Sequence, residues 1–327
     1  MANKKAPPKA PRVRSKAKVH PVVIFPFRFR LGTDVHFKQL LGFLKSLQVS
    51  NGGRYLDPIF VINDQTERWA RRPGKANSQL RVAFNRLVER IRTVFGEKSF
   101  EHVRSVDTCQ MWLAGLGRAC RNKATNRDVY WLVPGDFLYD AEGAHQGLQD
   151  MKCLPERVLT GDCTLAIGEI QVDRDNAKQL IDTYGTCGLL YNWFPDEAVK
   201  IRELTKKPRT EFFAVAHRRL ECLLNHRWFP YEQTVFILLQ AIRRRWKVMK
   251  VELDGLIDDG QNRETLAGAM EQVERFERAL KMYWREIHCG KQSRKAARKW
   301  PFGYRPLDRR SGEIRCAALT VLAQYLQ

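Results

Sequence analysis

Four short apolar runs, separated by segments with helical periodicity, constrain the fold of this chain more than any other feature. The runs are PVVIFPFRF at 21–29, PIFVI at 58–62, HVRSV at 102–106 and VYWLV at 129–133. Between them, apolar residues recur every three or four positions over 33–50, 74–95 and 109–123, as on one face of a helix. Strands that alternate with helices predict an α/β fold with a mostly parallel central sheet and right-handed crossovers.

The second half of the chain continues this mixture of elements. We predict strands at 163–170, 211–216 and 246–253, the last at an edge of the sheet, and one long amphipathic helix over 262–287. The remaining predicted helices cover 174–183, 196–205, 217–226, 231–245 and 313–326. The expected organisation is a disordered basic tail at 1–20, one α/β domain at 21–258, and a C-terminal helical extension with a basic segment at 259–327.

Charge is the unusual feature of the composition. The chain holds 57 Lys and Arg against 36 Asp and Glu, a formal net charge of +21. Residues 1–20 contribute seven basic residues and no acid, and residues 288–310 contribute eight basic residues and Asp308. This pattern predicts a phosphate-rich partner, either nucleic acid or an anionic lipid surface, although basic tails that only maintain solubility would give the same composition.

The cysteines indicate a reducing, cytoplasmic environment. Eight are present, without a C-x-x-C pair and without a Cys/His cluster at zinc spacing. The basic N-terminus has no apolar core of a secretory signal, and the longest apolar run, VFILL at 235–239, is too short to span a bilayer.

Two acidic residues stand directly after predicted strands. Asp64 follows the second apolar run, and Asp136 follows the fourth after a Pro-Gly corner. In open α/β sheets ligands bind outside the carboxyl ends of the strands, so both side chains are expected at one ligand-binding edge.

From residue 21 to about 253 the order of elements resembles that of GT-A glycosyltransferases, enzymes with one Rossmann-like domain that use nucleotide-diphosphate sugars. FVINDQT is similar to the family segment that contacts the nucleotide, and there Asp64 is the matching residue. VYWLVPGDF is similar to the segment that ends in the metal-binding Asp-x-Asp motif. Asp136 matches its last acid, and Pro134 replaces its first.

The resemblance implies how this site would work. A diphosphate leaving group gains negative charge as the glycosidic bond breaks, and Mg²⁺ or Mn²⁺ on carboxylate oxygens neutralises it. Asp136 is the expected metal ligand. Arg28, Arg30 and Lys75 are candidates to bind the phosphates directly.

The resemblance also implies a general base. Inverting members of the family use a carboxylate near the start of a helix in the second half, and Glu232 in HRWFPYEQTVFILL matches it. Asp258 and Asp259 could also reach the site. QVERF at 272–276 is similar to an acceptor motif of processive synthases, but we interpret it as a coincidence within a charged helix.

Each of these residues has a structural explanation as well. Asp136 could terminate a strand in a P-G-D turn, Asp64 could cap a helix, and Glu232 suits the first turn of a helix. Trp193 and Phe194 could stack on a ligand ring or belong to the core.

A glycosyltransferase is therefore the leading interpretation, with an unknown hydroxyl acceptor and with basic tails that could associate peripherally with an anionic membrane or polyanion. The alternative is a basic nucleic-acid-binding protein, since IRRRWKVMK at 242–250 interleaves cations with Trp246. A nuclease using Asp162 and Glu169 is a variant of that alternative.

Overall fold

The structure, a computed structural model, describes most of the chain between residues 17 and 289. The described ranges are 17–25, 33–63, 68, 75–103, 108–121, 125–135, 138–139, 144–170, 185–208, 211–224, 233–257 and 266–289, with 313, 314, 316, 317 and 320 beyond them. The predicted helix at 174–183 lies outside these residues, and the last predicted helix lies largely outside them.

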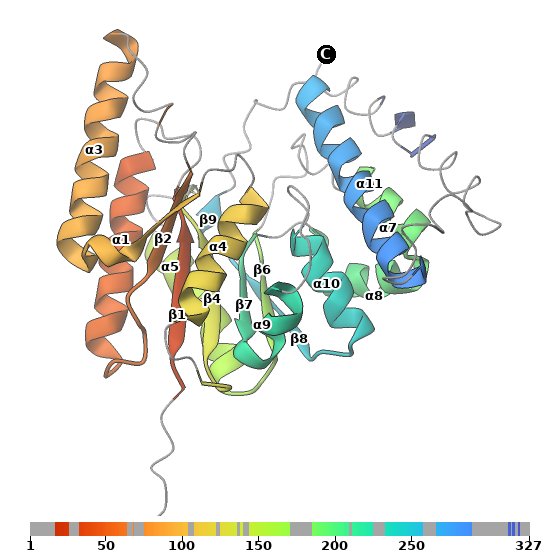
Figure 1. Cartoon of the computed structure of the whole chain (residues 1–327), viewed down its shortest axis with the longest axis horizontal. Coiled ribbons are helices and arrows are strands. Elements are labelled where there is room, and N and C mark those ends of the chain that lie inside the picture. The colour runs from red at the N-terminus through yellow and green to blue at the C-terminus, as the bar shows by residue number, and fades with distance from the viewer. Residues whose placement is uncertain are drawn as a thin grey trace, which may run out of the picture.

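A seven-stranded sheet forms the centre of the molecule (Figure 1). Its spatial order is β3-β2-β1-β4-β7-β6-β8. The strands are β1 (Val19–Ile24), β2 (Ile59–Asn63), β3 (Phe100–Val103), β4 (Val129–Pro134), β6 (Leu165–Glu169), β7 (Phe213–Ala216) and β8 (Val248–Glu252). The first four are parallel to one another, and β6 is parallel to β8, whereas β7 runs antiparallel to both β4 and β6. The predicted mostly parallel α/β sheet is confirmed.

Helices cover both faces of this sheet. One face carries α1 (Thr33–Ser50), α3 (Lys75–Phe95) and α5 (Ala144–Leu159), whose apolar side chains pack on β1, β2 and β4. The other face carries α4 (Thr108–Cys120), α7 (Cys187–Trp193), α8 (Pro195–Leu204), α9 (His217–Leu224), α10 (Gln233–Arg243) and α11 (Leu266–Cys289). The result is a three-layer α/β/α arrangement.

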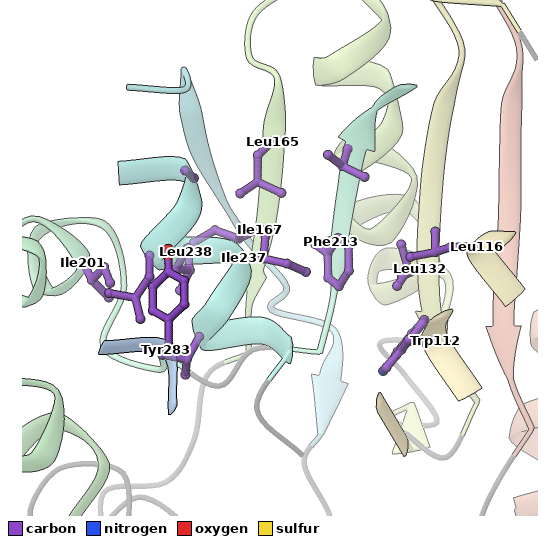
Figure 2. Packing of buried hydrophobic residues seen from close by; sticks show 14 of the residues in the cluster. Trp112, Leu116, Leu132, Leu165, Ile167, Ile201, Phe213, Ile237, Leu238 and Tyr283 are labelled. Carbon is purple, nitrogen blue, oxygen red and sulfur yellow. The ribbon is translucent and has the colours of Figure 1, made fainter. Parts of the chain in front are cut away.

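The alternation of side chains along each strand produces two separate cores. In β4, Tyr130 and Leu132 point to the α4 side, and Trp131 and Val133 point to the α1 side, all at 0% exposure. A strand covered on both faces must be apolar throughout, which explains the continuous run VYWLV. Figure 2 shows the α4-side core, where Trp112 and Leu116 of α4 lie beside Leu132.

The long C-terminal helix is part of this core. Val273, Phe276, Leu280 and Tyr283 of α11 are buried in the α4-side cluster, and Phe276 is 0% exposed. The ring of Tyr283 lies 5.5 Å from Phe194 and 4.8 Å from Phe236. α11 therefore packs on the preceding helices, and the helical setting expected for QVERF is present. The boundary at 258/259 stays a prediction.

The structure differs from the sequence prediction in several features. α7 was not predicted, and β3 begins at Phe100, two residues before the predicted strand. β1 begins at Val19, inside the segment predicted as a tail, because Val19 and His20 are buried between β4 and the chain at Tyr55. α5 was not predicted, and it contains a proline, Pro155. A separate two-stranded sheet pairs β5 (Leu138–Tyr139) antiparallel with β9 (Leu256–Ile257).

Candidate functional site

The carboxyl ends of β2 and β4 lie on either side of β1. Ile24, the last residue of β1, is in register with Val61 of β2 and with Pro134 of β4. Two strand spacings separate the ends of β2 and β4, a distance of about 10 Å. We call this edge of the sheet, at the carboxyl ends of β1, β2 and β4, the carboxyl edge.

The predicted acids follow these strand ends directly in the sequence. Asn63 ends β2 and precedes Asp64, and Gly135 follows β4 and precedes Asp136. Asp64 and Asp136 themselves lie outside the described residues. The strands thus deliver the chain to one edge immediately before each acid, as the sequence predicts.

The end of β2 is fixed by a buried polar contact. Asn63 is 0% exposed, and its Nδ2 donates to Sδ of Met111 in α4 at 3.3 Å. The backbone N–H of Phe25, just beyond β1, donates to the Val61 carbonyl at 2.9 Å. Together these contacts hold the chain in place up to the residue before Asp64.

The end of β4 is fixed by close packing. A Cβ on Gly135 would lie 2.4 Å from the Ile24 carbonyl oxygen and 2.4 Å from Cε2 of Phe37 in α1. Only glycine fits in this space, so the Pro-Gly corner allows the chain to pass directly over the end of β1. Asp136 is the next residue.

The other predicted site residues are placed in part. Lys75 is the first residue of α3, and its side chain lies outside the described residues. Arg28, Arg30, Glu232, Asp258 and Asp259 lie outside the described residues altogether. Glu232 immediately precedes α10 in the sequence.

The direction of α10 is set by its neighbour α8. Arg243 Nη1, at the end of α10, donates to Glu197 Oε1, at the start of α8, at 2.7 Å. Figure 2 shows Ile201 of α8 and Leu238 of α10 in the same core. α10 ends shortly before β8, and β8 begins at the edge opposite the carboxyl edge, where the Lys247 carbonyl accepts from the Thr164 N–H at 2.8 Å. The end of α8 leads to Lys206, whose backbone N–H lies 3.3 Å from Glu169 Oε2 at the carboxyl end of β6. The start of α10 therefore lies toward the carboxyl edge.

Asp162 and Glu169, the two acids of the alternative nuclease interpretation, do not lie together. Asp162 precedes β6 and Glu169 ends it, which separates them by most of the strand, more than about 13 Å. Asp162 pairs with Arg157 at 3.3 Å. The hydrogen bond from Thr160 and this pair lower the Asp162 pKa. Glu169 lies 3.7 Å from Lys250 Nζ. Each carboxylate is occupied separately, so the two do not form a shared metal site.

The aromatic candidates belong to the core. Trp193 and Phe194 are each 2% exposed. The Trp193 ring meets Trp284 edge-on at 6.2 Å. Trp246, the aromatic residue of IRRRWKVMK, is 6% exposed. These rings do not offer faces on which a base could stack.

A buried polar network lies at the opposite edge, at the amino ends of β1 and β4, and sequence reasoning missed it. His20 Nε2 lies 2.9 Å from Asp128 Oδ2, and the two residues are 3% and 2% exposed. Thr125 donates to Asp128 through both its hydroxyl (2.6 Å) and its backbone N–H (3.1 Å). Tyr130 Oη lies 2.9 Å from His217 Nδ1. In the sequence, the signal for this network was Asp128, a charged residue directly before the buried run VYWLV.

Among the described residues, no three His, Cys, Asp or Glu side chains come together as metal ligands. In the same part of the chain, no helix has the length and apolar character of a membrane span. Cys120, Cys153, Cys163, Cys187 and Cys316 are free thiols.

The fold is that of known nucleotide-sugar transferases. Glucosyl-3-phosphoglycerate synthase from Mycobacterium tuberculosis, solved with Mn²⁺, UDP and glucosyl-3-phosphoglycerate, superposes with a TM-score of 0.52 at 12% identity, covering 84% of this chain and 80% of that one. The same enzyme solved without these ligands gives 0.52 at 11% identity, covering 84% and 81%. A structure described only as a mycobacterial protein gives 0.51 at 14% identity, covering 84% and 75%. At these identities the likeness establishes the fold, and the predicted GT-A fold is confirmed.

No protein-family model matches the sequence, and no curated protein matches it.

Proposed function

We propose that this chain is a glycosyltransferase that moves a hexose from a nucleotide-diphosphate donor to a hydroxyl acceptor. The observation that carries the proposal is the register of β2 and β4 about β1, which brings the chain to one edge immediately before Asp64 and Asp136. A solved structure with the same fold holds UDP, Mn²⁺ and glucosyl-3-phosphoglycerate, and another holds UDP, Mn²⁺ and phosphoglyceric acid.

In this proposal Asp64 accepts hydrogen bonds from the nucleoside, and Arg28 and Lys75 donate to the phosphates. Lys75 at the first position of α3 also suits this role, because α3 follows β2 and so begins at the carboxyl edge. Positive charge and helix N–H groups at that position both favour a phosphate ligand.

The donor set suits a divalent cation with hard oxygen ligands. Asp136 offers one carboxylate, while Pro134 lies in β4 in register with Ile24 and offers no side-chain oxygen. Mg²⁺ and Mn²⁺ keep several waters and bind phosphate oxygens, so one carboxylate is sufficient. Such an ion, when bound, supplies positive charge to the diphosphate leaving group.

Glu232 is the proposed base. It takes the proton of the acceptor hydroxyl as that oxygen bonds to the anomeric carbon, and the bond from that carbon to the diphosphate oxygen breaks, releasing the nucleoside diphosphate with the electron pair. Its place before α10 suits this role, because the start of α10 lies toward the carboxyl edge.

A cytoplasmic location and peripheral association with an anionic membrane or polyanion belong to the same proposal. They rest on the free thiols among the described cysteines and on the basic ends of the sequence.

The test adds UDP or GDP to the protein, with and without Mn²⁺. Thermal unfolding and calorimetry measure the binding. A ligand that binds only the native state at about 100 times its Kd stabilises it by about 2.7 kcal/mol, so the unfolding midpoint should rise for one of these nucleotides. Asp136→Ala should remove the Mn²⁺-dependent part of that rise.

Asp162→Ala is the matched control. It removes one exposed carboxylate at the opposite end of β6 and should leave nucleotide binding unchanged. Unchanged midpoints for wild type with every nucleotide would overturn the proposal, and so would equal losses in the two variants.

A further inference from the structure

Among the exposed basic side chains along the edge of the sheet opposite the candidate donor site, five stand beside the ends of β1, β4, β7 and β8. They are Lys18 before β1, Arg127 before β4, Arg218 after β7, and Arg245 and Lys247 before β8. Because β7 is antiparallel to β4, its carboxyl end lies at this same edge. We call these five residues the basic edge.

Backbone hydrogen bonds make the β1, β4 and β7 part of the basic edge continuous. The Lys18 carbonyl accepts from the Val129 N–H at 2.8 Å, and the Asp128 carbonyl accepts from the His217 N–H at 2.8 Å. Arg127 and Arg218 are the sequence neighbours of Asp128 and His217. Three of the five cations are therefore held on adjacent strand ends.

The remaining two cations are joined to these through Trp246. The Arg219 guanidinium lies over the Trp246 ring, 5.4 Å from its centre, which connects α9 to the turn before β8. Arg245 and Lys247 flank Trp246 in the sequence, and the Lys247 carbonyl accepts from the Thr164 N–H at 2.8 Å.

The acids at this edge offset only part of its charge. Asp57, exposed before β2, accepts a hydrogen bond from Gln48, and Asp162 interacts electrostatically with Lys247. Asp128 is 2% exposed and its carboxylate is engaged by His20 and Thr125. Asp162 pairs with Arg157. Among the described residues, no ion pair includes any member of the basic edge.

The basic edge is long and narrow. From β1 to β8 the sheet order crosses four strand spacings, about 19 Å. A line of cations of this length suits a linear chain of phosphates better than it suits a flat lipid leaflet. The large exposed apolar residues of the described chain are Val35, Val49, Val82, Tyr191 and Val199. Of these, Val49 lies in the last turn of α1, near the start of β1, and one valine is much less than the apolar face by which a helix inserts into lipid.

We propose that the basic edge binds the phosphate backbone of nucleic acid without reading its sequence. The burial of Trp246 excludes stacking on bases and leaves contacts to phosphates, which position a protein but do not specify a sequence. The sequence before Ala17 adds six Lys and Arg and no acid, and it joins the described chain at this edge. This binding is independent of the proposed glycosyl transfer.

The test measures binding of the full chain to a fluorescent DNA duplex of about 20 base pairs, between about 50 and 200 mM KCl. The variant Arg127→Glu/Arg218→Glu/Lys247→Glu should bind at least about tenfold more weakly. Each lost phosphate contact reduces the slope of log K against log salt by about 0.9, so the slope should fall by about 3.

The control variant, Arg81→Glu/Arg86→Glu/Arg90→Glu, makes the same change of charge on exposed residues of α3. It should keep the wild-type slope. Equal losses in the two variants, or no effect of the basic-edge variant, would overturn the proposal.

A second arm uses phosphatidylcholine vesicles with and without phosphatidylserine. Binding to the anionic vesicles that depends on the basic edge, together with weak DNA binding, would assign the surface to a lipid leaflet and contradict the proposal. UDP binding should be the same in both variants and wild type, so failure here is distinguishable from failure of the proposed transferase activity.

Discussion

At the scale of single residues, the buried pair of His20 and Asp128 links stability to pH. Burial lowers the His20 pKa from its ordinary value of 6.5, although the hydrogen bond to Asp128 opposes this shift. Burial also acts to raise the Asp128 pKa, but hydrogen bonds from Thr125, His20 and Lys18 outweigh it and leave that pKa low. His217 and Lys18 are the other charged or titratable groups that act on His20.

The sign of the effect follows from proton binding. Below about pH 6.5 the unfolded chain binds a proton at His20 that the folded chain resists, so the free energy of unfolding should fall as the pH drops. Asp128 also contributes to the free energy of unfolding. That contribution is lost only when its carboxylate is protonated, below pH 3.8.

We predict that His20→Gln flattens this dependence between about pH 7 and pH 5, because the variant keeps an N–H donor for Asp128 but no longer titrates. Urea unfolding at a series of pH values measures it. His102→Gln, on an exposed residue of β3, is the control and should follow wild type. A His20→Gln curve as steep as wild type would assign the dependence to other groups.

At the scale of elements, the close approach of α4 to the sheet depends on one glycine. A Cβ on Gly115 would lie 2.4 Å from Val22 Cγ1 and 2.7 Å from Val61 Cγ2, whereas a Cβ on Gly117 of the same helix meets nothing within 4 Å. α4 also carries Met111, which contacts Asn63 next to the candidate site.

We predict opposite effects for the two glycines. Gly115→Ala should destabilise the protein by about 1–3 kcal/mol, because the added methyl group overpacks β1 and β2. Gly117→Ala should stabilise it by up to about 1 kcal/mol through helix propensity. Denaturant titration of both variants measures the difference, and equal effects would show that α4 is free to shift.

The sequence predicted the elements whose pattern is local. β1, β2 and β4 are continuous apolar runs, and α3 has one clear apolar stripe, so each is visible without knowledge of its neighbours. The direction of β7 was not predictable, because FAVA is equally apolar in either orientation and only its partners β4 and β6 decide it.

α5 was missed for a different reason. Gly147 and Pro155 suggest breaks, yet Leu148, Met151 and Leu154 are buried on one face, and this packing outweighs the unfavourable propensity. Pairing between two-residue strands such as β5 and β9 depends on residues far apart in the chain and leaves no local signal.

For the candidate site, the sequence predicted the common edge at which β2 and β4 end, since the rule for parallel sheets is general. The positions of the side chains of Asp64, Asp136 and Glu232 stay predictions. The close packing around Gly135 was not predictable. It arises from Ile24 in β1 and Phe37 in α1, which are far from Gly135 in the sequence.

At the scale of the whole molecule, α11 closes the core on the α4 side. Phe276 is 0% exposed, and Tyr283 contacts residues of both α7–α8 and α10. The segment predicted as an extension therefore contributes to the stability of the molecule.

We predict that Phe276→Ala lowers the free energy of unfolding by about 3–5 kcal/mol, as expected for a large cavity in a core. Glu274→Ala, two residues away on the exposed side of α11, should change it by less than about 0.5 kcal/mol. A single unfolding transition in both variants would show that α11 unfolds with the sheet, and a small effect of Phe276→Ala would show that it does not.

β1 is six residues long, so the two ends of the sheet stand about 20 Å apart. A molecule bound to a polymer through Lys18 and its neighbours would turn the candidate donor site away from that polymer, toward the surrounding solution. The proposed transferase would then act on freely diffusing acceptors while it stays bound. The polymer would be a support and not a substrate.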